Sequence, residues 1–210
     1  ALTLILMAAR RAGEGERLVR AGRWEGWHPT QMLGLHVTGK TLGVVGLGRI
    51  GKAIARRCHC GFGMKVIFHN RSRVADPGLP AEQVDRLEDL AARADIVAVA
   101  VPGGAETHHL VGAEFFAAMQ SHGIFVNISR GDVVDEAALV AALQAGRIGA
   151  AGLDVYEFEP KVPRALTALE NAVLLPHLGT AALEVRTAMG MMAVENLVAH
   201  FEGRGLPNPV

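Results

Sequence analysis

The sequence predicts an α/β protein built on a doubly wound parallel sheet, with helices on both faces. From Thr41 onward, apolar runs of about five to seven residues alternate with amphipathic segments of helix length, which is the pattern of repeated βα units. Half of the residues are hydrophobic, but only 5% are aromatic. This composition predicts the aliphatic core of a sheet that is buried on both faces.

The elements follow one another in regular order. Six apolar runs are the expected strands: Thr41–Gly46, Lys65–His69, Asp95–Val101, Gly123–Ile128, Ala150–Val155 and Ala172–Pro176. Helices are expected over residues 2–12, 49–61, 85–93, 112–120, 135–145 and 181–201. Asp135 is a typical N-cap for the fifth helix, and Gly146 is a typical end. Right-handed crossovers between parallel strands place such helices on both faces of the sheet.

Charge and cysteine content narrow the possible partners and the compartment. Lys and Arg balance Asp and Glu at 21 each, so no net charge attracts nucleic acid or an anionic membrane. Cys58 and Cys60 lie too close together in a predicted helix to close a sensible disulfide loop, and no matching ligand pair completes a zinc site. We therefore expect reduced cysteines in a cytoplasmic protein without a metal site.

The segment TLGVVGLGRIGKAIA contains Gly46, Gly48 and Gly51 in G-x-G-x-x-G spacing. An apolar strand precedes these glycines and an Ala-rich helix follows, which is the context of a dinucleotide-binding loop. Gly46 permits the tight turn, Gly48 lets a pyrophosphate approach the backbone, and Gly51 lets the helix pack closely on the strand. The helix N-terminus then offers N–H groups to the phosphates. The alternative is a purely structural strand-to-helix turn.

The end of the second strand bears on the choice of cofactor. An NAD site needs an acidic residue there, about 20 positions past the glycines, to bind the ribose hydroxyls. This sequence has Asn70 instead, followed by Arg71, Ser72 and Arg73. Two guanidinium groups and a hydroxyl can bind a 2′-phosphate. The loop predicts a preference for NADP(H), with NAD possible; the alternative is a solvated basic loop.

Three separated segments follow strand ends at the carboxyl edge of the sheet, where ligands bind in this architecture. They are NISRGDVVDEAAL at 127–139, AGLDVYEFEP at 151–160 and LLPHLGTAA at 174–182. Reduction of a 2-oxo acid requires a cation for the carboxylate and a proton donor for the carbonyl oxygen. Arg130 and His177, with a carboxylate partner for the histidine, would supply these groups.

Each candidate also has a structural interpretation. Arg130 could cap a strand edge or bind a surface carboxylate, and His177 could be a hydrogen-bonded structural histidine. Glu159 could be a solvated carboxylate, and Glu157 lies only two residues away. The catalytic interpretation is favoured because three chemically complementary residues share one edge of one sheet.

On these motifs the chain, from about Ala1 to Val210, closely resembles the D-isomer-specific 2-hydroxyacid dehydrogenases, which have a Rossmann dinucleotide-binding domain. The resemblance implies that Arg130 binds the substrate carboxylate and carbonyl. It implies that Glu159 pairs with the catalytic histidine, and that His177 is the acid/base. A buried His177 beside Glu159 would have its cationic form favoured.

The resemblance also implies further cofactor contacts. Asp154 would contact the nicotinamide carboxamide, and Pro102 and Thr107 lie in the loop that passes the nicotinamide ribose. Together with the residues above, the expected cofactor contacts are Gly46, Gly48, Arg49, Ile50, Gly51, Asn70, Arg71, Ser72, Arg73, Pro102, Thr107, Ser129, Asp154 and Gly179. Gly103 and Gly104 replace bulkier residues of the family, which would loosen this loop. His108 and His109 are interpreted as surface residues rather than metal ligands, because no carboxylate or third histidine completes a site.

The resemblance further predicts the organisation of the chain. Residues 1–40 would form a helix and dimerisation arm, residues 41–202 the dinucleotide-binding domain, and residues 203–210 the return to a substrate domain largely absent from this chain. The chain opens without Met in what reads as mid-helix, so we expect a fragment that binds dinucleotide but turns over poorly. Trp24 and Trp27 could insert into a partner, which favours a homodimer, or pack under the domain itself.

The function expected is reduction of a small 2-oxo acid with NADP(H), most specifically of glyoxylate or hydroxypyruvate. The basic cofactor loop and the 18-residue spacing from Glu159 to His177 resemble that subgroup (177 − 159 = 18). A dinucleotide-sensing protein similar to the corepressors built on this fold is the alternative from another class. Oxidation of phosphite or of another 2-hydroxy acid also stays open.

Overall fold

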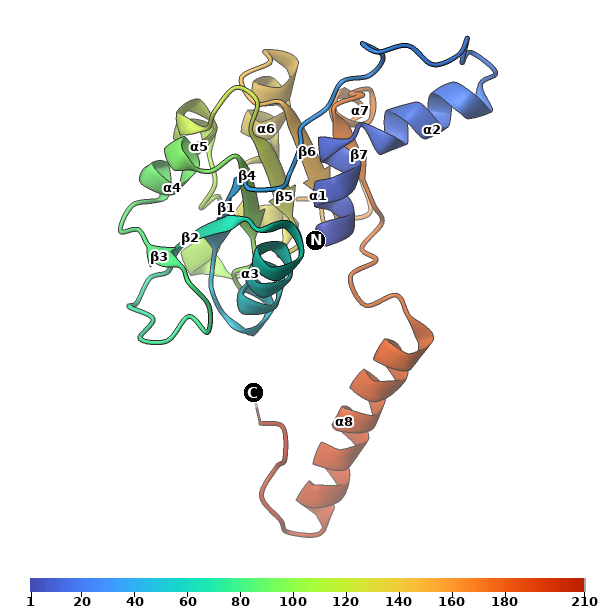
Figure 1. Ribbon diagram of the computed structural model, residues 1–210. Helices are drawn as coiled ribbons and strands as arrows, with labels where there is room; N and C mark the ends of the chain where they lie inside the picture. Colours follow the sequence, from blue (N-terminus) through green and yellow to red (C-terminus); the bar gives the residue numbers. More distant parts are fainter. Residues whose placement is uncertain (210) are drawn as a thin grey trace. The chain divides into compact units, whose positions relative to one another are not determined.

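The structure, a computed structural model, describes residues 1–209. Seven parallel strands form one sheet in the order β3–β2–β1–β4–β5–β6–β7 (Figure 1). The strands are β1 (Thr41–Val45), β2 (Lys65–His69), β3 (Glu82–Gln83), β4 (Ile96–Val99), β5 (Ile124–Asn127), β6 (Ala150–Leu153) and β7 (Ala172–Leu174). The strand order reverses between β1 and β4, and this switch point is where doubly wound sheets bind ligands. The predicted fold class is confirmed.

The helices connect these strands and cover the sheet. They are α1 (Leu2–Ala9), α2 (Ala12–Arg20), α3 (Arg49–Phe62), α4 (Leu87–Arg93), α5 (Ala113–Ala118), α6 (Glu136–Gln144), α7 (Arg164–Thr167) and α8 (Leu183–Phe201), with the 3-10 turns η1 (Ala105–Thr107) and η2 (Gly131–Val133). The predicted cap is present, because Asp135 Oδ1 accepts a hydrogen bond from the Ala138 N–H at 3.0 Å. Gly146 lies just past α6 with a positive φ of 62°, as the predicted stop requires.

Strand residues alternate between two hydrophobic layers, as the period of two in a β-strand dictates. In β4, Ile96 and Ala98 face the layer that contains α1 and α3 residues, whereas Val97 and Val99 face the layer that contains residues of α4, α5 and α6. All four residues are fully buried. Burial on both faces explains why the strand sequences are continuous apolar runs.

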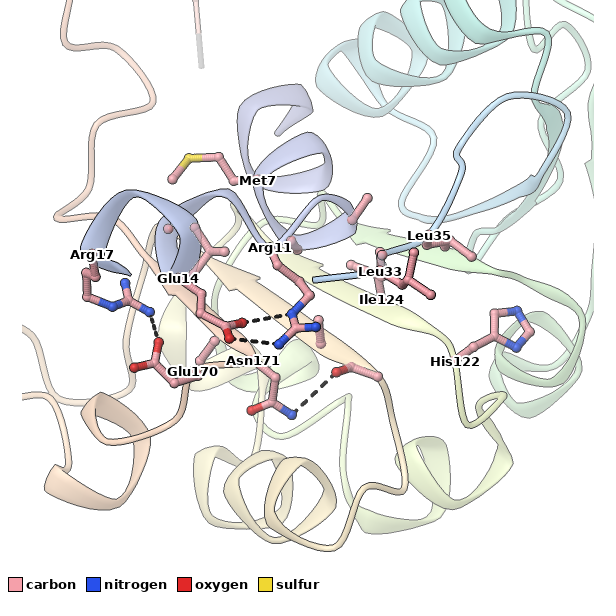
Figure 2. A pocket seen from close by; sticks show the side chains of 18 residues that line it. Met7, Arg11, Glu14, Arg17, Leu33, Leu35, His122, Ile124, Glu170 and Asn171 are labelled. Carbon is pink, nitrogen blue, oxygen red and sulfur yellow. Dashed lines mark hydrogen bonds and ion pairs between the residues drawn. The ribbon is translucent and has the colours of Figure 1, made fainter. Parts of the chain in front are cut away.

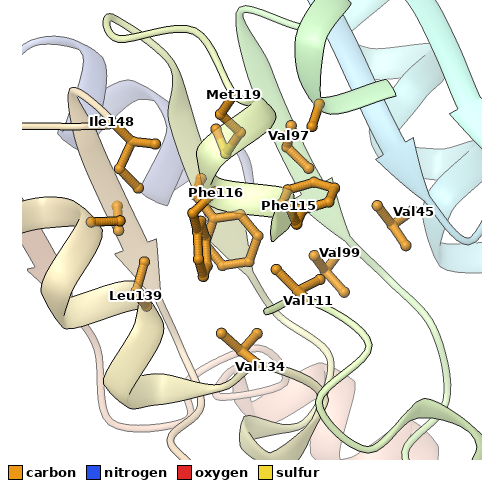
Figure 3. Packing of buried hydrophobic residues seen from close by; sticks show 14 of the residues in the cluster. Val45, Val97, Val99, Val111, Phe115, Phe116, Met119, Val134, Leu139 and Ile148 are labelled. Carbon is orange, nitrogen blue, oxygen red and sulfur yellow. The ribbon is translucent and has the colours of Figure 1, made fainter. Parts of the chain in front are cut away.

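The second layer holds a small aromatic cluster within the otherwise aliphatic core (Figure 3). Phe116 packs edge-on against Phe125, with ring centroids 5.1 Å apart and an interplanar angle of 84°. Phe115 contacts both rings in the same edge-to-face manner. The cluster joins α5 to the central strand β5.

Two predictions about elements were wrong. The sheet has a seventh strand, β3, whose two residues pair with β2 at the sheet edge. The predicted helix 2–12 ends at Ala9, because Arg11 adopts a left-handed φ of 51° and a second helix begins at Ala12. Its apolar part, α1, packs so closely on β6 that a Cβ at Gly152 would lie 2.8 Å from the Cβ of Leu4. The following helix, α2, has no buried residues.

The contacts divide the chain into a unit of residues 1–177 and a second unit that begins at Leu178. The domain boundaries that the resemblance implies, after residues 40 and 202, stay predictions. Within the second unit, Asn196 on α8 exchanges two hydrogen bonds with the backbone of Asn208, at 2.8 and 2.9 Å. Across residues 1–209, none of the helices combines the length and the apolar character that a bilayer crossing demands.

Candidate functional site

The glycine-rich loop between β1 and α3 has the geometry that its sequence predicts. Gly46 has a φ of 94°, and a Cβ there would lie 2.7 Å from a methyl carbon of Val101. A Cβ at Gly51 would lie 2.1 Å from the carbonyl oxygen of Gly46, so only glycine lets α3 pack this closely. At Gly48 a Cβ would meet no atom within 4 Å. The structural predictions for Gly46 and Gly51 are confirmed, and Gly48 leaves the open approach that a pyrophosphate needs.

The basic segment after β2 is tied to this loop. Asn70 Oδ1 accepts a hydrogen bond of 2.6 Å from the backbone N–H of Leu47. Arg71 forms an exposed ion pair with Glu106 of η1. The carbonyl of Ser72 accepts a hydrogen bond of 3.1 Å from Gln83 Nε2, and Arg73 is exposed. Arg71 and Arg73 therefore lie on the surface, where a phosphate can reach their side chains. Their role in binding the cofactor stays a prediction.

A cavity of about 700 Å³ lies along the switch point between the first and second halves of the sheet. Its lining comes from three loops: Gly48, Arg49, Ile50, Ala100, Val101, Pro102, Gly103, Gly104, Ile128, Ser129, Arg130 and Asp132. Among these residues are six of the predicted site residues. A dinucleotide-sized space therefore connects the glycine-rich loop to the predicted substrate-binding arginine.

The segment that carries Arg130 is held in place by Asn127, which sequence reasoning did not single out. Asn127 is buried at the end of β5. Its Oδ1 accepts a hydrogen bond from the Ser129 N–H at 3.0 Å, and its Nδ2 donates one to the Arg130 carbonyl at 2.9 Å. The Ser129 hydroxyl donates to the Val101 carbonyl, which joins this loop to the loop after β4. The sequence signal that could have identified Asn127 is a polar residue at the end of an apolar strand.

Arg130 is exposed and lies across Gly103. A Cβ added at Gly103 would come within 2.7 Å of the Arg130 Cγ. The sequence interpretation was that Gly103 and Gly104 loosen this loop. The structure gives Gly103 a more specific role, because its missing side chain makes room for the stem of the arginine.

The predicted acid/base pair is formed by His177 and Glu159, which come from two different strand ends. His177 Nδ1 lies 3.1 Å from Glu159 Oε2, within hydrogen-bond distance. The other carboxylate oxygen of Glu159 accepts a hydrogen bond of 3.1 Å from the Tyr156 N–H. The expectation that His177 is buried was wrong, because its side chain is 52% exposed in this chain. His177 also has a left-handed φ of 55°, which is uncommon for a residue other than glycine.

The charge state of Glu159 follows from its neighbours. Partial burial raises the pKa of Glu159, but the hydrogen bonds from His177 and from the Tyr156 N–H act in the opposite direction. The positive charges of His177 and Arg130 add to that effect, and the pKa of Glu159 is held below its ordinary value. Glu159 is therefore ionised at neutral pH, and the positive charge of Arg130 contributes to this state.

Tyr156 is a second residue that sequence reasoning missed. Its hydroxyl donates a hydrogen bond of 3.0 Å to the Leu175 carbonyl, two residues before His177, while its backbone N–H holds Glu159. Burial, followed by the nearby carboxylates of Asp154, Glu136 and Glu159, raises the pKa of Tyr156 to about 12. The phenol therefore stays protonated and donates to the segment that carries His177, while the backbone N–H of the same residue holds Glu159.

Other predicted cofactor contacts do not line the cavity at the switch point. Asp154 is buried just after β6, and its N–H donates to the Asn127 carbonyl at 3.1 Å. The Thr107 hydroxyl donates to the Pro102 carbonyl at 2.8 Å and so closes the loop after β4. Gly179 belongs to the second unit. The cofactor roles of Asp154, Thr107 and Gly179 stay predictions.

The interpretation of His108 and His109 needs one correction. A carboxylate does reach them, because His109 Nε2 lies 2.8 Å from Glu157 Oε1. The sequence could not show this contact, since it joins the loops after β4 and β6 across 48 residues. Glu157, which sequence reasoning treated only as a residue easily confused with Glu159, faces a different partner.

A second cavity, of about 530 Å³, lies at the opposite edge of the sheet (Figure 2). Its lining includes Ile124, Ala150 and Ala172, at the starts of three strands. The ion pairs Arg11–Glu14 and Arg17–Glu170 lie at its rim on the side of α2. None of the predicted catalytic or cofactor residues lines this cavity.

One protein family has a sequence model that matches residues 2–179, and its description is "D-isomer specific 2-hydroxyacid dehydrogenase, NAD binding domain". A glyoxylate reductase of Thermococcus litoralis is 44% identical over 216 residues, a match that covers 100% of this chain and 65% of that protein. A glyoxylate/hydroxypyruvate reductase B of Cronobacter sakazakii is 46% identical over 205 residues, covering 96% of this chain and 63% of the relative.

Solved structures show the same similarity. The crystal structure of an NADPH-dependent glyoxylate/hydroxypyruvate reductase from Sinorhizobium meliloti, in complex with NADP and malonate, is 42% identical with a TM-score of 0.92. This match covers 100% of the chain and 65% of that structure. The chain thus spans 63–65% of the length of these three relatives.

Proposed function

Because this chain belongs to the D-isomer-specific 2-hydroxyacid dehydrogenase family and carries its NAD-binding domain, we propose that the protein moves a hydride between NADP(H) and a small 2-oxo or 2-hydroxy acid. The observation that carries this proposal is the His177–Glu159 pair, joined at 3.1 Å and under the influence of Arg130. This pair lines a cavity of about 260 Å³ that follows β6 and β7, on the carboxyl edge of the sheet, where ligands bind in this architecture.

The residues present fit a dinucleotide. Gly48 leaves open space where a pyrophosphate would approach, and it forms the N-cap of α3 without a side-chain cap. The first N–H groups of a helix and its dipole favour phosphate oxygens. A reduced nicotinamide, when bound, supplies the hydride for the substrate carbonyl carbon. Arg49, Ile50, Pro102 and Ser129 line the same cavity and would flank the cofactor.

The segment of Asn70, Arg71, Ser72 and Arg73 would select NADP(H) over NAD(H). Asn70 carries no charge to repel a 2′-phosphate, and both arginines are exposed beside the glycine-rich loop. Arg71 can exchange its exposed partner Glu106 for a phosphate at little cost, because surface ion pairs are worth about 0–1 kcal/mol. The relative of known structure at 42% identity is NADPH-dependent by its description, which supports this preference.

The catalytic roles follow from the donors and charges in place. Arg130 would bind the substrate carboxylate and stabilise charge that develops on the carbonyl oxygen. His177 turns Nδ1 toward Glu159, so Nε2 is the ring nitrogen left to exchange a proton with that oxygen. Ionised Glu159 favours the imidazolium that donates this proton during reduction. In oxidation the neutral imidazole accepts it back.

Glyoxylate and hydroxypyruvate are the substrates we propose, since three relatives that match 96–100% of the chain at 42–46% identity are described as reductases of these acids. A panel of glyoxylate, hydroxypyruvate, pyruvate and longer 2-oxo acids, assayed with NADPH on the full-length protein, tests this. The highest kcat/KM is expected for the two small acids. If kcat/KM is highest for a longer acid, or for the oxidation of phosphite, the protein has a different substrate from the one proposed. The chain would still belong to the same family.

The same assay separates an enzyme from a dinucleotide-sensing protein. A sensor would bind NADPH, yet the oxidation of NADPH would stay at the uncatalysed rate with every acid in the panel. A dehydrogenase shows turnover that depends on both NADPH and a 2-oxo acid.

A homodimer is proposed from the arm of residues 1–40. Trp24 and Trp27 are 53% and 79% exposed and Leu33 is 66% exposed, so the tryptophans do not pack under the domain of their own chain. Large apolar side chains gathered on a surface mark interaction sites. Sedimentation of the full-length protein should give a dimer that the double substitution Trp24→Ser and Trp27→Ser dissociates; an unchanged mass would refute the proposal.

We place the protein in the cytoplasm. Cys58 and Cys60 are both free thiols. Burial, only partly opposed by the positive charge of the chain's amino terminus, raises the pKa of Cys58 to about 11, so this thiol stays protonated and unreactive. Fractionation of cells that express the protein tests the placement, and a periplasmic or secreted pool would contradict it.

A further inference from the structure

A cluster of three potential metal ligands lies outside the proposed active site. His108 and His109 end the loop after β4, and Glu157 belongs to the loop after β6. One ligand atom from each of the three side chains lies within 4.8 Å of the others. The two histidines are exposed and the carboxylate is largely buried, so the cluster opens to solvent on the histidine side.

The arrangement suits a transition-metal ion better than a calcium or magnesium ion. Imidazole nitrogens and a carboxylate are ligands of zinc, whereas the alkaline-earth ions take oxygen ligands. Around tetrahedral zinc, with bonds of about 2.0–2.1 Å, neighbouring ligand atoms lie about 3.3 Å apart. His109 Nε2 and Glu157 Oε1 are already 2.8 Å apart, so rotations of exposed side chains suffice to open the cluster around an ion.

The two imidazole rings are stacked on one another. The ring centroids of His108 and His109 lie 4.0 Å apart with an interplanar angle of 26°. His109 adopts a left-handed φ of 49°, and its N–H donates to the Asp132 carbonyl at 2.8 Å. A positive φ is unusual for a residue other than glycine, and in this conformation His109 Nε2 lies 2.8 Å from Glu157 Oε1.

The Glu157 carboxylate is anchored by a hydrogen bond from the protein backbone, as the carboxylate ligands of metal ions commonly are. Glu157 Oε2 accepts a hydrogen bond of 3.3 Å from the Glu136 N–H, at the start of α6. The Glu157 N–H in turn donates to Glu136 Oε2 at 3.4 Å. One carboxylate oxygen is therefore anchored to the fold, and the other remains directed at the histidines.

We infer that His108, His109 and Glu157 form a binding site for a divalent transition-metal ion, with Zn²⁺ as the probe, and that water completes the coordination. The ion cross-links the loop after β4, which lines the cofactor cavity through Gly103 and Gly104, to the loop that carries Glu159. Binding of the metal therefore restrains two loops of the active site without placing the metal among the reacting groups. The inference does not depend on turnover.

Calorimetric titration of the metal-free chain with Zn²⁺ tests the site directly. Saturation is expected at one ion per chain. His108→Gln and Glu157→Gln should each weaken binding at least about tenfold, since loss of even an outer-shell partner costs about 10–100-fold. His36→Gln is the matched control, because His36 is also exposed but lies outside the cluster. Thermal unfolding without metal shows whether each variant is folded.

Hydrogen exchange gives a second measurement, since Zn²⁺ should protect amides of residues 105–111 and 155–160 in the parent chain but not in His108→Gln. Two results would overturn the inference. One is the absence of saturable Zn²⁺ binding by the folded parent. The other is equal affinity in the parent, His108→Gln and Glu157→Gln, which would assign the ion to another group of ligands.

Discussion

Asn70 Oδ1 accepts a 2.6 Å hydrogen bond from the backbone N–H of Leu47, which lies 23 residues earlier in the chain. The contact joins the end of β2 to the loop of Gly46 and Gly48. An oxygen at this position therefore holds the glycine-rich loop, at the residue that we propose lies beside the ribose end of the cofactor. Charge at this residue can be changed without removing the acceptor that the loop needs.

Asn70→Asp should reverse the cofactor preference. The aspartate keeps an oxygen for the Leu47 N–H but adds a negative charge beside the 2′-phosphate. Two charges at about 4 Å repel by about 1–4 kcal/mol, depending on exposure, so the Kd for NADPH should rise about tenfold or more. The Kd for NADH should fall or stay constant. Fluorescence titration of this chain with both cofactors measures the ratio, and an unchanged ratio would remove Asn70 from cofactor selection.

Gly103→Ala should impair substrate binding through Arg130. The new Cβ would lie 2.7 Å from the Arg130 Cγ, so the guanidinium must move. A misplacement of about 1 Å can cost about 100-fold in rate, and we expect at least a tenfold loss of kcat/KM in the full-length protein.

Gly61→Ala is the matched control, since a Cβ at Gly61 on α3 meets no atom within 4 Å. The Kd for NADPH should be measured for both variants, because Gly103 lines the cavity. A kcat/KM of Gly103→Ala within twofold of the parent would show that Arg130 does not depend on this glycine.

Tyr156→Phe should lower kcat and leave the binding of NADPH unchanged. The variant loses the 3.0 Å hydrogen bond to the Leu175 carbonyl but keeps the N–H that holds Glu159. Loss of such a bond costs about 0.5–1.5 kcal/mol of folding free energy, which urea unfolding measures. A positioning role predicts that the pH profile of kcat also shifts, since His177 follows Leu175 by two residues. Lower stability with an unchanged profile would make the hydroxyl purely structural.

Asp95 should make the stability of the fold depend on pH. Burial raises the pKa of Asp95, but the Thr41 N–H at 2.8 Å, His122 at 2.7 Å and the charge of Lys40 lower it below its ordinary value. The unfolded chain therefore binds a proton more readily than the folded chain. The contribution of Asp95 is complete above the unfolded pKa of about 3.9 and is lost as the pH falls through the lower, folded pKa.

Urea unfolding of the parent and of Asp95→Asn, from neutral pH down to about pH 3, measures this contribution. The variant should be less stable by about 1.5–3 kcal/mol at neutral pH, the range for hydrogen bonds to a charged group. The difference should narrow at the acid end. A difference in unfolding free energy that is the same at every pH would show that the negative charge of Asp95 does not contribute to stability.

The fold was predictable because its determinants are local. Each central strand is an apolar run, and the helix boundaries at Asp135, Gly146 and the glycine-rich loop are written in short motifs. The break after Ala9 was missed because it depends on Arg11 adopting a left-handed conformation that most arginines avoid. The two-residue strand β3 was missed because it exists only through its pairing with β2.

The site was predictable as three motifs and a loop, but the contacts that hold them were not. The roles of Asn127 and Tyr156 come from hydrogen bonds to loops that the fold brings together. The contact of His109 with Glu157 spans 48 residues, and no spacing rule reaches that far. Exposure of His177 could not be read from a motif, because it depends on what else packs over that loop.

The central claim is that His177 exchanges a proton with the substrate while Glu159 stabilises its charge. His177→Gln in the full-length protein, assayed with NADPH and glyoxylate, tests this claim most directly. Because general acid–base catalysis contributes about 100- to 10,000-fold, kcat should fall at least about 100-fold, while the Kd for NADPH stays within twofold of the parent value. A folded variant that keeps more than half of the parent kcat would contradict the account.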